Sequence, residues 1–184
     1  RFICADASNV QLPDVPFDRL FSRFGSMFFA EPHQAFANLR SLLRPGARID
    51  LAVWAPPRDN LWMMEMMGVV RRHVDIPPAV PRAPGPFAFE DLEYLNEVLA
   101  AGGFSSPDIM AYTGQQPVGG VGATAQEAVS FVLSSMAVGK ALDEQGTDVR
   151  AAAEGELLEL FAKHHVPNQG VMMQGKAWLV SAKA

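Results

Sequence analysis

The chain has 184 residues and a net charge of −5, and 49% of its residues are hydrophobic while 19% are charged. This composition excludes a chain that is disordered throughout, because the apolar residues suffice to bury a core. The basic residues never run longer than a pair. Nucleic acid is therefore not expected as the main partner, since neutralising phosphates needs a concentrated basic face.

The single cysteine, Cys4, excludes an internal disulfide framework and a cysteine-rich zinc site. No apolar run approaches the ~20 residues that cross a bilayer, and no signal peptide opens the chain. We therefore expect a cytoplasmic protein without a membrane span.

The first 54 residues predict a parallel α/β unit. Phe2–Ala5 is a short apolar run, typical of a buried strand that ends at Asp6. Phe17–Phe24 and Ile49–Trp54 also predict strands, and helical apolar spacing between them begins at Pro32. We expect this helix to end at Arg44-Pro45-Gly46. The strand–helix–strand order is the signature of parallel pairing.

The rest of the chain predicts further helices and strands around a proline-rich loop at residues 76 to 87. Thr124 followed by Glu127 is a candidate capping box at one helix start. The expected helices are Asn60–Val74, Glu90–Ala101, Thr124–Leu142 and Val149–His165, and the expected strands are Asp108–Val118 and Lys176–Ala182.

Three segments in the first 50 residues carry a family resemblance: Ala5-Asp6-Ala7, Phe17–Gly25 and Leu43–Arg48. In this order and spacing they resemble the class I methyltransferases that use S-adenosylmethionine, especially the quinone-biosynthesis and small-molecule group. The resemblance implies a Rossmann-like α/β fold with a mostly parallel, seven-stranded sheet. It also implies that the last strand lies antiparallel beside the fifth.

The family order assigns the strands of this chain. Phe2–Ala5 would be the third strand and Phe17–Phe24 the fourth, followed by Ile49–Trp54 as the fifth. The sixth would be Ile109–Val118 and the seventh Lys176–Ala182. The first two strands would then be missing, and we expect a single carboxyl-terminal portion of a methyltransferase domain, residues 1–184.

The resemblance also implies site residues near strand ends, where open α/β sheets bind ligands. Asp6 would contact the adenine amino group of the cofactor, and Ala7 would let the ring approach. Ser22 and Arg23 would line its methionine end, and Phe24 the substrate. The alternative is structural: Asp6 would then be a loop or capping residue, and Arg23 a surface residue.

A methionine-rich stretch at residues 62–67 has two interpretations. Met commonly fills gaps in a core, but Trp62, Met63 and Met66 beside a proline-rich loop would also suit a lid over an apolar substrate. We expect lid segments at about 58–88 and 119–148. His33 is a weak candidate for a catalytic base, and no metal site is expected. The catalytic residue is unknown, because methyl transfer by in-line displacement depends mainly on alignment and desolvation.

The sequence departs from the family at the glycine-rich cofactor turn, which does not precede Arg1. The glycines at 119, 120 and 122 lie too far downstream to replace it. We expect one of three states: a piece of a longer chain, which we favour, pairing with a second copy as a homodimer, or pairing with a complementary fragment.

The predicted function is methyl transfer from S-adenosylmethionine to a small, apolar molecule. The main alternative is a catalytically incompetent, methyltransferase-like interaction module. A generic nucleotide-binding α/β protein is a third candidate.

Overall fold

The computed structural model describes all residues, Arg1–Ala184, and the chain divides into two compact units. Unit 1 comprises Arg1–Pro56, Ala79–Tyr112 and Lys176–Ala184, and unit 2 comprises Pro57–Pro78 and Thr113–Gly175. None of the helices combines the length and hydrophobicity that crossing a bilayer requires.

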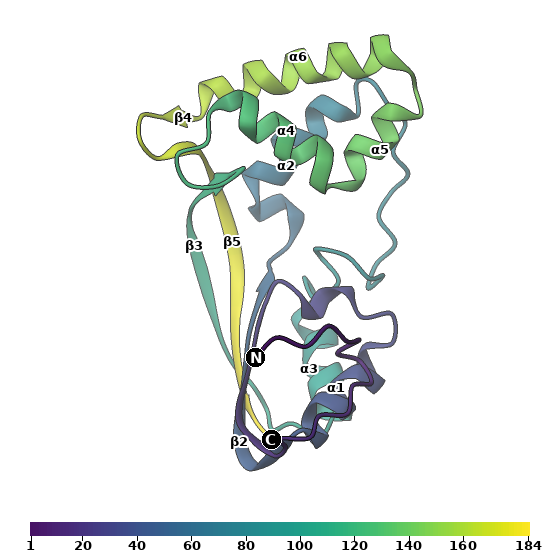
Figure 1. Ribbon diagram of the computed structural model, residues 1–184, viewed down its shortest axis with the longest axis vertical. Coiled ribbons are helices and arrows are strands. Elements are labelled where there is room, and N and C mark those ends of the chain that lie inside the picture. The colour runs from purple at the N-terminus through teal and green to yellow at the C-terminus, as the bar shows by residue number, and fades with distance from the viewer. The chain divides into compact units, whose positions relative to one another are not determined.

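A mixed sheet with the strand order β1-β2-β5-β3 organises the chain (Figure 1). Strands β1 (Phe17–Arg23) and β2 (Leu43–Trp54) are parallel, and β5 (Gly170–Lys183) lies antiparallel beside β2. Strand β3 (Asp108–Val118) follows β5, and β4 (His165–Val166) pairs with the beginning of β5. The predicted α/β fold, with its parallel strand pair and antiparallel last strand, is confirmed.

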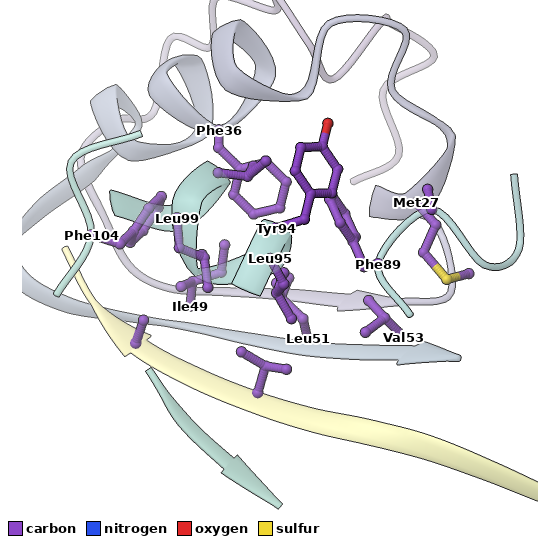
Figure 2. Packing of buried hydrophobic residues seen from close by; sticks show 14 of the residues in the cluster. Met27, Phe36, Ile49, Leu51, Val53, Phe89, Tyr94, Leu95, Leu99 and Phe104 are labelled. Carbon is purple, nitrogen blue, oxygen red and sulfur yellow. The ribbon is translucent and has the colours of Figure 1, made fainter. Parts of the chain in front are cut away.

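In unit 1, helices α1 (Pro32–Ser41) and α3 (Leu92–Ala101) cover one face of the sheet. The side chain of Asp91 caps α3 by accepting the Glu93 N–H at 2.9 Å. Figure 2 shows aromatic and aliphatic side chains from both helices meeting the apolar residues of β2. The fully buried side chains of this core include Phe36, Ile49, Val53, Phe89, Leu95 and Leu99.

The other face of this sheet, which we call the open face, carries exposed apolar side chains. Phe21 on β1 is 69% exposed and Met110 on β3 is 61% exposed. Alternation along the strands explains this difference: Ile49, Leu51 and Val53 of β2 point into the core, whereas Asp50 and Ala52 belong to the open face.

Unit 2 is mainly helical. It contains α2 (Leu61–Val70), α4 (Ala125–Ser135), α5 (Ala137–Asp143) and α6 (Thr147–Lys163), and its short 3-10 turn η2 spans Pro57–Asp59. The predicted capping box is confirmed: Glu127 N–H donates to Thr124 Oγ1 at 3.2 Å, and Thr124 N–H donates to Glu127 Oε2 at 2.8 Å.

Three sequence predictions are corrected by the structure. Phe2–Ala5 is not a strand, and the side chain of Phe2 is fully exposed. A strand forms only where its backbone pairs with a neighbour, and no pairing involves these residues.

Strand β2 begins at Leu43 rather than at Ile49, so Arg44-Pro45-Gly46 belongs to the strand and not to a helix end. Backbone pairing explains this extension, since Phe17 N–H donates to Leu42 O and Gly46 N–H donates to Ala184 O, both at 2.8 Å.

The helix predicted at Thr124–Leu142 is divided into α4 and α5. Met136 between them has extended backbone angles, with φ −117° and ψ 153°. Gly139 explains the tight break, because a Cβ at this position would lie 1.7 Å from Leu133 O.

Candidate functional site

A cavity of about 590 Å³ lies in unit 1 beside β1. Its walls are mostly apolar and come from three segments: the loop that includes Ala7 and Val10, strand β1 with the turn that follows it, and the end of α1. A 3-10 turn, η1 (Ser26–Phe28), contributes Ser26 at the carboxyl end of β1. The volume of the cavity is within the range of small-molecule sites.

Asn38 on α1 fixes the loop that forms one wall of this cavity. Its Nδ2 donates to the carbonyl oxygens of Ala7 and Val10, both at 3.3 Å. Next to Ala7, Asp6 Oδ1 accepts the backbone N–H of Ser8 at 2.9 Å, and this bond lowers the pKa of Asp6. Asp6 is therefore an ionised, exposed carboxylate directly beside the cavity wall.

Two serines line the cavity where β1 ends. Ser26 N–H donates to Ser22 Oγ at 3.2 Å. Ser26 is only 2% exposed, and its own Oγ is buried without a hydrogen-bond partner. A buried hydroxyl normally has a partner, because leaving it unsatisfied costs free energy. The sequence analysis missed Ser26. The signal that could have found it is a small, polar Gly25-Ser26 pair immediately after a strand.

The structure separates Arg23 and Phe24 from this cavity. Arg23 lines a groove of about 1140 Å³ on the open face, with Asp50 and Met110 among its other residues. Phe24 stacks on Trp54, with ring centroids 4.1 Å apart. Of the residues predicted to contact the cofactor, the cavity thus brings together Ala7 and Ser22.

The groove on the open face contains a cluster of charged side chains. Asp50 Oδ1 accepts from Arg48 Nε at 2.7 Å and from Ser181 Oγ at 2.8 Å, and Arg19 Nε lies 3.5 Å from Asp50 Oδ2. Burial alone would raise the pKa of Asp50, but the hydrogen bonds from Arg48 and Ser181, with the nearby Arg19 charge, lower it. Asp50 therefore remains ionised and forms ion pairs with Arg48 and Arg19 on the open face.

Three predicted substrate residues lie within unit 2. Trp62 and Met66 are buried, and Met63 is half-buried. Trp62 Nε1 donates to Oδ1 of the buried Asn60 at 3.2 Å. The burial of Trp62 and Met66 fits the interpretation of this stretch as core packing.

His33, the candidate base, lies on α1 with a side chain that is 44% exposed. Its Nε2 is 3.3 Å from Glu97 Oε1. It therefore belongs to a surface pair, and it is not among the residues that line the cavity.

Comparisons with known proteins identify the family resemblance independently. Residues 1–50 match the family described as a methyltransferase domain. This match agrees with the predicted resemblance to methyltransferases over these 50 residues. No curated protein sequence matches the chain.

Solved structures share the fold at low sequence identity. The YcgJ protein from Bacillus subtilis is 15% identical, with a TM-score of 0.51 over 97% of this chain and 68% of that one. A protein from Anabaena variabilis, described as a methyltransferase from an antibiotic biosynthesis pathway, is 14% identical, with a TM-score of 0.51 over 96% of this chain and 71% of that one. At these identities the likeness establishes the fold.

Proposed function

We propose that this chain, whose residues 1–50 match the family described as a methyltransferase domain, binds S-adenosylmethionine in the cavity beside β1 and serves methyl transfer to a small, apolar molecule. The observation that carries the proposal is the unpartnered, buried hydroxyl of Ser26 in a cavity that Ala7 and Ser22 also line.

The residues present fit the adenosine part of this cofactor. A flat, largely apolar base suits walls of small and aliphatic side chains, and Ala7 leaves room for close approach. Asp6 accepts hydrogen bonds from the backbone and the side chain of Ser8, and we assign its exposed carboxylate to the exocyclic amino group of the base. The hydroxyls of Ser22 and Ser26 supply polar groups at the other end of the cavity.

When bound, S-adenosylmethionine supplies an electrophilic methyl group on a positively charged sulfur. The protein's part is to bind and orient the reactants and to exclude water, since in-line displacement depends on alignment. Arg23 and Phe24 lie outside the cavity, so we assign the methionine end of the cofactor to the hydroxyls of Ser22 and Ser26. The apolar lining of the cavity favours an apolar acceptor.

Equilibrium dialysis of the full chain against labelled S-adenosylmethionine tests the proposal. We expect micromolar binding that is weakened about fivefold in Ser26→Ala, the effect of one neutral hydrogen bond. Ala7→Leu should weaken binding further, because its side chain would fill the cavity. The matched control is Ser41→Ala, since the exposed Ser41 hydroxyl donates only to Asn38 O within α1.

Absence of binding by a folded chain would refute the proposal and favour the alternative of an interaction module. An unchanged affinity in Ser26→Ala would mean that the cofactor binds outside this cavity. Methyl transfer itself is checked by following the labelled methyl group into a panel of small apolar acceptors.

A further inference from the structure

A proline-rich segment of unit 1, residues 80–88, is bonded to the turn that carries Ser26. Three of the nine residues in this segment, which we call the strap, are prolines and have no backbone N–H to donate. Gly85 retains its N–H and donates it to Met27 O at 3.0 Å. Met27 belongs to η1, the same turn that contributes Ser26 to the cavity wall. The strap therefore contacts the cofactor cavity through η1.

The strap is fixed on α3 by the side chain of Arg82. Arg82 Nη2 donates to Asp91 Oδ2 at 3.1 Å. Its Nη1 lies 3.9 Å from Glu97 Oε2, and its Cζ lies 4.5 Å from the centroid of the Tyr94 ring. The Tyr94 ring is buried beside Phe89 (Figure 2), so the guanidinium rests on the hydrophobic core. Arg82 thus combines ionic contacts with a cation–π contact.

The backbone of Arg82 is strained. Ala83 N–H donates to Val80 O at 3.2 Å, which closes a four-residue turn with Arg82 at its third position. Arg82 has a φ of 63°, and glycine is the usual residue at this position when φ is positive. A strained conformation persists only where its surroundings hold it, and such residues cluster at ligand clamps and switch regions. The contacts of the Arg82 side chain with α3 compensate for this strain.

We propose that Arg82 is a positioning residue for the cofactor cavity, an inference that rests on the proposed function. By docking the strap on α3, Arg82 keeps Gly85 N–H within reach of Met27 O. This bond holds η1, and with it Ser26, at the cavity wall. The docked strap therefore presents Ser26 to the cofactor, and docking and cofactor binding favour each other by the same factor.

The turn η1 has a second anchor that does not depend on the strap. Met27 Sδ accepts Trp54 N–H at 3.3 Å, although sulfur is a weak acceptor. Loss of the bond from Gly85 therefore loosens η1 on one side while β2 still retains it. Substitution of Arg82 should consequently lower the affinity for the cofactor by degrees and leave the chain folded.

Amide hydrogen exchange of the full chain without cofactor tests the docking of the strap. Exchange at Gly85 and at Ser26, whose N–H donates to Ser22 Oγ, should be about fivefold faster in Arg82→Ala than in the wild type. This factor corresponds to the loss of a half-exposed ion pair and a cation–π contact.

The charge of residue 82 should set the size of this effect. Arg82→Lys keeps the positive charge and should restore part of the protection. Arg82→Glu places a negative charge near Asp91 and Glu97 and should speed exchange more than Arg82→Ala.

Two matched controls should exchange at Gly85 and Ser26 as the wild type does. Val80→Ala changes an exposed side chain on the same strap. Arg150→Ala removes an arginine that pairs with Asp143 in unit 2.

Equilibrium dialysis against labelled S-adenosylmethionine tests the link to Ser26. Arg82→Glu should weaken binding by at most about fivefold, the effect expected for Ser26→Ala, because an undocked strap removes the contribution of the same hydroxyl. In a Ser26→Ala background, Arg82→Glu should cause no further loss. A residue that only stabilised the fold would weaken binding equally in both backgrounds. Saturating cofactor should also slow exchange at Gly85 in the wild type.

Unchanged exchange at Gly85 in Arg82→Glu, or equal losses of affinity in the two backgrounds, would overturn the inference. If Arg82→Glu speeds exchange at Gly85 and Ser26 but the wild type binds no cofactor, the proposed function alone fails. If the affinity depends on Ser26 as expected but is the same in Arg82→Glu and the wild type, the positioning role of Arg82 alone fails.

Discussion

Phe24 stacks face to face on Trp54, with ring centroids 4.1 Å apart and an interplanar angle of 12°. Phe24 has a φ of 58°, a left-handed conformation that is unfavourable for a bulky residue. The stack and the bond from Phe24 N–H to Ala52 O hold this conformation at the carboxyl end of β1. The chain consequently turns at Gly25 and directs Ser26 into the cavity.

Replacing Phe24 by glycine and by alanine should separate backbone strain from side-chain packing. Both variants lose the ring, but alanine keeps the unfavourable φ while glycine adopts it freely. We expect Phe24→Ala to have a free energy of unfolding about 1 kcal/mol below that of Phe24→Gly.

Urea denaturation measures this difference. Phe28, an exposed residue of η1, is the control. There glycine should be the less stable of the two replacements, because it gains more conformational freedom on unfolding. The same order at both positions would contradict the role of the left-handed φ.

Because of Asp50, the free energy of unfolding should depend on pH in the acid range. Its folded pKa is lowered, so its contribution is present at neutral pH, above the unfolded pKa of about 4. This contribution is lost as the pH falls through the folded pKa. We expect Asp50→Asn to lower the free energy of unfolding by about 1–2 kcal/mol at pH 7, and the difference from the wild type to disappear toward pH 2.

Urea midpoints measured between pH 2 and pH 7 check this expectation. Asp14→Asn is the matched control, because Asp14 belongs to an exposed pair with Arg1. That change should alter stability by less than about 0.5 kcal/mol. A constant difference between Asp50→Asn and wild type over the whole pH range would show that ionisation of Asp50 is not its source.

Elements whose signals are local could be predicted from the sequence. Asp108–Val118 was predicted with the bounds of β3, and the capping residues of α4 were identified from Thr124 and Glu127. The errors arose where distant contacts decide the outcome. The bond from Gly46 to Ala184 extends β2 through Arg44-Pro45-Gly46, which in isolation looks like a helix end.

The candidate site was predictable only where the family resemblance covers it. Ala7 and Ser22, chosen from that resemblance, line one cavity. Ser26 was not identified from the sequence, because burial and a missing hydrogen-bond partner are properties of the folded chain. Phe24 was assigned correctly to the end of a strand, but its left-handed turn toward Trp54 depends on packing that no local pattern reveals.

Thr124 should stabilise the start of α4 through its side chain. Thr124→Ala removes the oxygen that accepts the Glu127 N–H, and we expect a loss of about 1 kcal/mol. Thr124→Ser keeps that oxygen and should retain most of the stability. Amide hydrogen exchange in the first turn of α4 measures this effect. The exchange should be faster than in the wild type for Thr124→Ala but not for Thr124→Ser. Equal exchange in both variants would show that the capping box does not limit fraying of this turn.

Gly102 and Gly103 follow α3 and are required for different reasons. Gly102 has an ordinary φ of −73°, but a Cβ there would lie 2.8 Å from Phe36 Cβ on α1. Gly103 has a φ of +86°, and its Cβ would meet only Arg40 Cγ, at 3.6 Å. The first glycine provides space for close helix packing, and the second provides a left-handed helix end.

Alanine and asparagine distinguish these two requirements. At Gly102 we expect alanine to cost about 1–3 kcal/mol by forcing α1 and α3 apart, and the larger asparagine to cost more. At Gly103 alanine should cost about 1 kcal/mol, and asparagine less, because asparagine tolerates the left-handed conformation. Thermal and urea unfolding of the four variants should therefore give alanine a higher free energy of unfolding than asparagine at Gly102. At Gly103 the order should be reversed. An identical ranking at both positions would mean that one cause, either space or conformation, acts at both glycines.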